Sequence, residues 1–150
     1  AWLLGLALAW ISAEALAQGQ GDWVLDCAPE KPCVAKSSLS YRTGTMLVVA
    51  PKTFTVTMRD DAAKPSVTMQ LSDTEVRYAQ LRLDQPTKLS DMVCDAVNCS
   101  MSFADARATI DGMKAGRKAA ILLFTNNGQV LQVGLSGAGF AEAITRTRGN

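Results

Sequence analysis

The 150-residue chain contains no histidine, and only 6% of its residues are aromatic. The missing histidine excludes Ser-His-Asp and Cys-His catalytic sets, histidine metal ligands and a histidine pH switch. Neither sign of charge dominates, because 15 basic residues stand against 14 acidic ones. This balance, together with the lack of a long basic run, argues against a nucleic acid as the main partner.

Long hydrophobic runs are also lacking, apart from the apolar stretch Ala1–Ile11. It is too short for a membrane-spanning helix, which needs about 20 residues, but it has the length of a signal-peptide hydrophobic region. Ala15-Leu16-Ala17 follows and fits a cleavage site. We therefore expect residues 1–17 to be a signal peptide that lacks its own start, with a buried N-terminal helix as the alternative. Residues 18–150 should then form a single β-rich domain.

Export would place the protein in the periplasm, at the cell surface or outside the cell. After removal of residues 1–17, no further stretch is long and apolar enough to span a membrane. We accordingly expect no membrane span in the mature chain.

Alternation of apolar and polar residues with a period of two predicts strands through most of the chain. Phe54–Met58 and Val67–Leu71 show this pattern on either side of a polar loop, so they predict a hairpin. Residues 79–83 form another such strand, which Pro86 ends or places at a sheet edge.

The continuously apolar run Ala119–Phe124 predicts a strand covered on both faces, with a buried helix as the alternative. Asn127-Gly128 is a strong hairpin-turn signal and pairs this strand with Val130–Leu135. The chain's strands therefore continue close to its C-terminal end.

Two short helices are predicted near the C-terminal end. The first carries an apolar stripe at Phe103, Ala106, Ile110 and Met113, begins after the capping residue Ser102 and is ended by Gly116. The second runs from Phe140 to about Arg146. Since strands dominate, the expected fold is mainly β: an antiparallel β-sandwich or small barrel with one or two short peripheral helices.

Four cysteines form two close pairs, Cys27 with Cys33 and Cys94 with Cys99. Four cysteines allow three pairings, and we expect these two local disulfides because each pair flanks a short turn-like stretch between strands. Zinc binding and disulfide exchange are the alternatives. Cys27 and Cys33 are spaced more widely than the usual C-x₂₋₄-C of zinc sites, and Cys94 and Cys99 stand at the upper limit of that spacing. Neither pair is the C-x-x-C of redox sites, and an exported chain meets an oxidising compartment.

No catalytic set stands out in the sequence. There is no Ser-x-x-Lys motif, and we expect neither a metal site nor a cofactor. Paired carboxylates could hydrolyse glycosides, but those of this chain fall in predicted turns or strand ends, where solvated acidic residues are common. The pairs concerned are Asp60-Asp61, Asp73 with Glu75, and Asp91 with Asp95.

The order of several features is more specific than any one of them. Gly21–Cys27 is followed by Cys33, then by Cys94–Cys99, by a helix pattern ending at Gly116, and by a Ser-x-x-Gly-Phe-x-x-Ala ending that starts at Ser136. This order resembles the invasion-associated locus B (IalB) family of exported α-proteobacterial proteins.

The resemblance spans nearly the whole mature chain. Gly137 departs from it, since the family usually has a larger apolar residue there, and residues 40–90 match only in strand character. The resemblance implies a link to host-cell invasion in some pathogens, but it implies no catalytic residues. The residues that it marks as structural are the four cysteines together with Trp23, Gly116, Ser136, Gly139 and Phe140.

Together these features predict a small exported protein that is not an enzyme and that binds another protein or an envelope component. An exposed sheet edge or the surface near the disulfide hairpins would serve for binding. A periplasmic enzyme that uses carboxylates or a Ser-Lys pair is one alternative. A structural or stress-protective envelope protein is the other.

Overall fold

The computed structural model describes residues 22–45 and 48–148, so the expected signal peptide lies outside the described residues. The described strands form one antiparallel sheet of nine strands in the order β1-β2-β3-β4-β7-β6-β5-β8-β9. The strands are β1 (Val24–Asp26), β2 (Val34–Thr45), β3 (Val48–Arg59), β4 (Ser66–Leu71), β5 (Val76–Leu83), β6 (Lys88–Asp95), β7 (Asn98–Met101), β8 (Ala119–Thr125) and β9 (Val130–Leu135).

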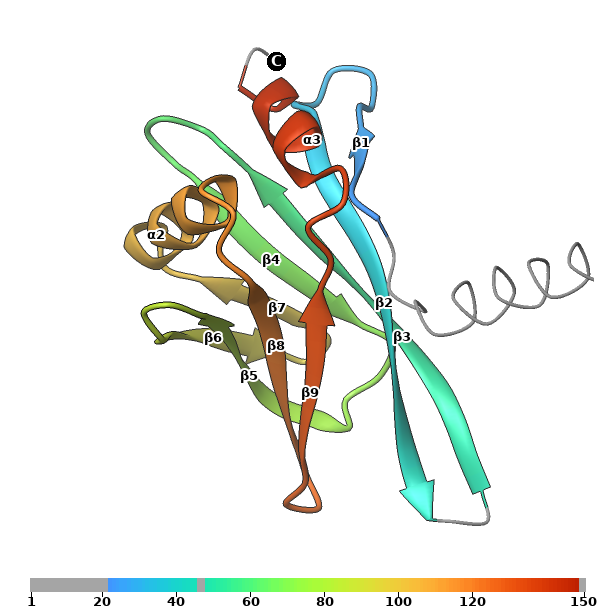
Figure 1. Cartoon of the computed structure of the whole chain (residues 1–150). Helices are drawn as coiled ribbons and strands as arrows, with labels where there is room; N and C mark the ends of the chain where they lie inside the picture. The colour runs from blue at the N-terminus through green and yellow to red at the C-terminus, as the bar shows by residue number, and fades with distance from the viewer. Residues whose placement is uncertain (1–21, 46–47, 149–150) are drawn as a thin grey trace, which may run out of the picture.

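The sheet curls on itself, so that β9 comes to lie against β2 without pairing with it (Figure 1). This arrangement confirms the predicted mainly β, antiparallel fold. All nine strands belong to one curled sheet whose first and last strands do not pair, so its shape is that of a half-barrel. Alternate residues of the strands point into the curl and form the core, as in β4, where Val67, Met69 and Leu71 are buried.

Two helices lie in the described part of the chain, α2 (Phe103–Lys114) and α3 (Phe140–Arg146), at the two predicted places. The hydroxyl of Ser102 caps α2 by accepting a hydrogen bond from Asp105 N at 3.2 Å. The buried face of α2 includes Ala106, Ile110 and Met113 of the predicted stripe, but Phe103 is 56% exposed. None of the described helices is long and apolar enough to cross a membrane.

Strands β2 and β3 form a long hairpin that the sequence analysis did not predict. Its strands pair from Ala35 with Met58 out to Thr45 with Val48, whereas β3 pairs with β4 only from Phe54 onward. The outer half is therefore a two-stranded ribbon that extends beyond the rest of the sheet (Figure 1).

Disulfides join Cys27 to Cys33 and Cys94 to Cys99. The first closes the turn between β1 and β2, and the second joins directly opposed residues of β6 and β7. Strands β3 and β4 separate the two hairpins in the sheet order. The bridges therefore hold two separate hairpins and do not frame one common site.

Removal of the second bridge should weaken the fold modestly. In the double variant Cys94→Ser/Cys99→Ser we expect the free energy of unfolding to fall by about 2 kcal/mol, because so short a loop restricts the unfolded chain only moderately. Urea denaturation of the wild type and the variant measures this difference. The double variant Cys27→Ser/Cys33→Ser is the comparison of similar loop length, and an unchanged unfolding midpoint in both would contradict a stabilising role.

Candidate functional site

Trp23 joins the start of the sheet to the segment that follows its last strand. Its backbone N–H donates to Ala138 O at 3.1 Å, and its indole Nε1–H donates to Ser136 O at 2.7 Å. Its ring also meets the ring of Phe140 edge to face, with the centroids 5.0 Å apart. Since Trp23 is only 4% exposed, these contacts close the curled sheet from inside. We call this set of contacts the Trp23 clamp.

Gly139 completes the Trp23 clamp. Its φ of 77° lies in the left-handed region, and a Cβ at this position would lie 2.8 Å from Trp23 O. The hydroxyl of Ser136 accepts a hydrogen bond from Ala138 N at 3.1 Å and so shapes the turn that leads to Gly139. Four of the residues that the family resemblance marked as structural thus meet at one place.

Gly116, which the resemblance also marks as structural, ends α2 with a φ of 89° and donates its N–H to Met113 O at 3.0 Å. Together with Ser136 and Phe140, it lines a hollow of about 400 Å³ between the end of α2 and the start of α3. We call it the helix-junction hollow. Its lining residues are Met113, Lys114, Gly116, Arg117, Lys118, Ala119, Leu135, Ser136, Gly137, Phe140 and Ala141.

A second hollow, of about 620 Å³, shares Gly116, Arg117 and Lys118 with the first and extends to Asp84. Arg117 forms its wall: Nε donates to Asp84 O at 3.0 Å, and a terminal nitrogen of the guanidinium donates to Pro86 O. Arg117 therefore holds the turn between β5 and β6 against the end of α2.

Asp60 lies at the end of β3 and is fully buried, so the expectation of a solvated turn residue was wrong for this carboxylate. Its Oδ1 accepts from Arg107 at 2.7 Å, and its Oδ2 lies 3.2 Å from Lys114 Nζ and 3.1 Å from Arg148 Nε. Its backbone N–H donates to the hydroxyl of Thr147 at 2.9 Å. One carboxylate thus ties the sheet to α2 and to the end of α3.

The charge on Asp60 is stabilised despite its burial. Burial alone would raise the pKa of this carboxyl, but the hydrogen bonds from Arg107 and Lys114 outweigh that effect and hold the pKa below its usual value. The pKa of Arg107 is raised by the same hydrogen bond. The sequence could not indicate this cluster, because its members lie on three separate segments.

A second ion cluster joins β3 to the connection between β4 and β5. Lys52 pairs with both Asp73 and Glu75, and its hydrogen bond lowers the pKa of Asp73. Nearby, burial raises the pKa of Tyr41, and the charge of Asp73 adds to that effect. These acids are partly exposed ion-pair partners.

The candidate acids do not converge on one place among the described residues. Asp60, Asp61, Asp73 and Glu75 line none of four hollows of the structure, while Asp95 lines one of about 470 Å³ over β4, β6 and β7. Asp91 and Asp95 are exposed on β6. Residues 22–45 and 48–148 also contain no group of three Asp, Glu or Cys side chains placed to hold a metal ion.

The outer face of the sheet carries an apolar ridge that the sequence analysis did not single out. Tyr78 of β5 lies opposite Phe124 of β8, which lies opposite Val130 of β9, and the Tyr78 and Phe124 rings stack with centroids 4.2 Å apart. Val93 of the neighbouring strand β6 follows the Ala79–Met92 pair. The signal that could have revealed the ridge is the continuously apolar β8, whose outward residues are only partly covered.

Comparison with known proteins gives a match to one protein family. The model of a family described as "Invasion associated locus B (IalB) protein" matches residues 23–148. This match covers the sheet, both helices, the disulfides and the Trp23 clamp. No curated protein and no solved structure matches the chain significantly.

Gly139→Ala should destabilise the protein more than an alanine in a left-handed conformation does where no atom lies near its Cβ. The added methyl group would strain the backbone and collide with Trp23 O. We expect a loss of roughly 2–4 kcal/mol in unfolding free energy, by addition of a clash to the left-handed penalty. Gly128→Ala is the matched control: its φ is 85°, but no atom lies within 4 Å of its Cβ position. Equal losses in urea denaturation would contradict the clamp.

Asp60 should make stability fall in acid. Its pKa is lower in the folded than in the unfolded protein, so its contribution is full above the unfolded value of about 4 and is lost as the pH falls through the folded value. Asp60→Asn should therefore flatten the decline in unfolding free energy below pH 4.

The same variant should also lose stability at pH 7. We expect a loss of roughly 2–3 kcal/mol, less than for a fully buried ion pair, because the cationic partners are partly exposed and screened. Asp95→Asn, at an exposed position, is the control. Wild-type acid sensitivity in Asp60→Asn, measured by urea denaturation at several pH values, would contradict this role.

Proposed function

Because the chain belongs to the invasion associated locus B family, we propose that it is an exported envelope protein that is not an enzyme and that binds another protein or an envelope component. The two disulfides support an oxidising compartment such as the periplasm or the cell exterior. We also propose a contribution to host-cell invasion, and this part of the proposal rests on family membership alone.

One observation carries the binding role, namely the apolar ridge on the outer face of the sheet. Val93 is 76% exposed, Val130 58% and Tyr78 40%, and they join the stacked ring of Phe124. Contiguous exposed apolar groups are typical of interaction surfaces, and aromatic residues are enriched at the centre of such surfaces. We infer that a partner covers the ridge.

The arrangement of the acids supports a non-enzymatic role. An envelope enzyme that used carboxylates would need them to converge in a hollow, where burial and neighbouring charge adapt their pKa values. In this protein the carboxyl groups with lowered pKa, Asp60, Asp61 and Asp73, are held in ion pairs or hydrogen bonds outside the hollows. Their charges therefore stabilise contacts between segments of the chain.

The ridge can be tested with two matched substitutions. Val130→Glu places a charge on the ridge, whereas Val24→Glu does so on β1, at the opposite edge of the sheet, where Val24 is 59% exposed. In cells that express the full chain, a photo-reactive residue at Tyr78 should crosslink a partner in the envelope fraction. We expect Val130→Glu to reduce the crosslinked product at least tenfold, about 1.4 kcal/mol of binding, and Val24→Glu to leave it unchanged.

Two results would contradict the binding role of the ridge. The first is the absence of any crosslinked product from Tyr78 in the envelope fraction. The second is an equal yield from the wild type and Val130→Glu. The melting temperatures of both variants show whether each is folded, so a loss of product from misfolding is recognised.

A further inference from the structure

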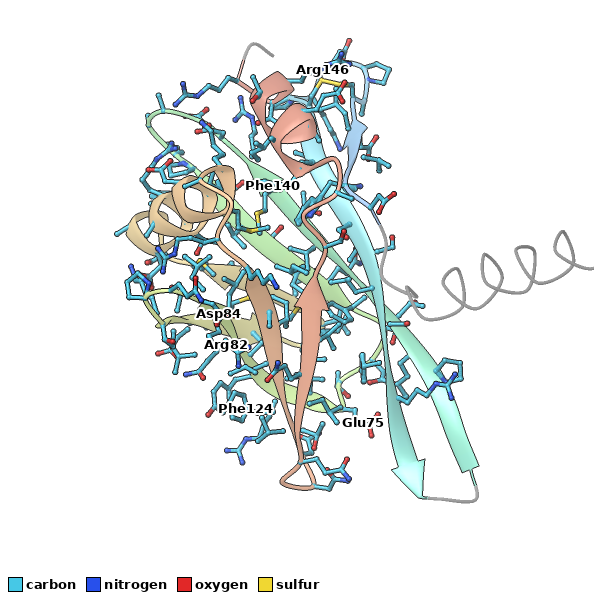
Figure 2. The ribbon with its side chains drawn as sticks, in the orientation of Figure 1. Glu75, Arg82, Asp84, Phe124, Phe140 and Arg146 are labelled. Atoms are coloured by element: carbon cyan, nitrogen blue, oxygen red, sulfur yellow. A yellow bond between two sulfur atoms is a disulfide. The ribbon has the colours of Figure 1, made fainter. Side chains whose placement is uncertain are left out.

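We propose that the helix-junction hollow binds a small amphipathic anion, a molecule with one anionic group and a short apolar part. The hollow lies at the opposite end of the β8–β9 hairpin from the apolar ridge. Figure 2 shows this separation, with Phe140 near the hollow and Phe124 near the β8–β9 turn. The inference is therefore independent of the proposed function, and each can fail without the other.

The charges that line the hollow have one sign. Three of its lining residues are cationic, Lys114, Arg117 and Lys118, and none is acidic. Lys114 is paired with Asp60. Within the described part of the chain, neither Arg117 nor Lys118 forms an ion pair, since the side-chain hydrogen bonds of Arg117 go to the carbonyl groups of Asp84 and Pro86. The charge of Lys118 is thus available to an anionic group, whereas the guanidinium of Arg117 is partly engaged at the turn between β5 and β6.

Complementing the dipole of α2 does not account for all of these cations. The field at a helix end favours basic residues, but it falls off within the last turn. Lys114 is the last residue of α2 and fits this explanation. Lys118 lies four residues further on, beyond the chain reversal at Gly116, where Lys118 O already accepts from Asp84 N at 2.9 Å. Lys118 therefore stands outside the last turn of α2.

The rest of the lining is apolar. Met113, Ala119 and Phe140 are buried and Leu135 is half-buried, whereas Lys114 and Lys118 are exposed, so we infer an apolar floor and a cationic rim. Its volume of about 400 Å³ falls within the usual range for small-molecule sites, about 300–1,000 Å³. A purely polar anion would leave this floor uncovered, which is why the ligand must be amphipathic.

Gly137 offers a position at which a side chain can be added beside the hollow. It lines the hollow, and a Cβ built on it meets no atom within 4 Å. Its φ lies outside the left-handed region. A larger side chain can therefore stand there without backbone strain, and because Gly137 lines the hollow, we expect the methyl groups of a leucine at this position to obstruct it.

Titration calorimetry of the full chain with octyl phosphate tests the proposal. We expect octyl phosphate to bind at least tenfold more tightly than inorganic phosphate, which has no apolar part, or 1-octanol, which has no charge. Lys118→Gln should weaken binding at least fivefold, and Gly137→Leu should abolish it. Lys64→Gln, which removes a lysine from the exposed loop between β3 and β4, should bind like the wild type.

Vesicles of phosphatidylglycerol show whether the ligand is a membrane lipid or a free amphipathic anion. Vesicle binding that octyl phosphate displaces indicates a lipid in its bilayer, whereas binding of octyl phosphate alone indicates a free anion, and both results support the site. The proposal is overturned if octyl phosphate binds no better than inorganic phosphate or 1-octanol. It is also overturned if Lys118→Gln and Gly137→Leu, shown to be folded by thermal unfolding, both bind like the wild type.

Discussion

The hydrogen bond from the indole of Trp23 to Ser136 O is the contact on which the rest of the structure depends. The two residues are separated by 113 positions, and they join the two edges of one curled sheet. A sheet with open edges exposes unpaired backbone groups, and β9 and β2 lie together without pairing. The Trp23 clamp replaces that missing pairing with two hydrogen bonds and one aromatic contact. It explains why Gly139 must lack a side chain, since Trp23 O occupies the space.

The clamp also sets the position of α3, and through it the charged cluster at Asp60. Phe140, which packs on Trp23, is the first residue of α3. The residues that follow this helix, Thr147 and Arg148, reach Asp60 at the end of β3. Since Arg107 and Lys114 approach the same carboxylate from α2, both helices are fixed by one buried charge. The helix-junction hollow between them is consequently a product of the clamp and of Asp60 together.

Local features of this fold could be predicted from sequence, because each is encoded within a few neighbouring residues. The capping of α2 by Ser102, the Asn127-Gly128 turn and the alternation in Val67–Leu71 belong to this class. The extension of β2 and β3 to Thr45 and Val48 could not be predicted, since only pairing between the two strands supports it. Asp60 was misjudged for a related reason. Its own neighbours indicate a solvated turn, while the cations that surround it come from α2 and the C-terminal end.

The absence of histidine gives the two proposed binding surfaces a shared property. Histidine is the side chain whose ordinary pKa lies near neutrality, so the ridge and the hollow contain no group of that kind. The cations of the hollow are arginine and lysine, and the ridge consists of apolar and phenolic groups. Salt screens the attraction between a cation and an anion, whereas contact between apolar groups does not depend on that attraction. Added salt or a competing anion should therefore release a ligand from the hollow and leave a partner on the ridge, so the two surfaces can be told apart by the salt dependence of their binding.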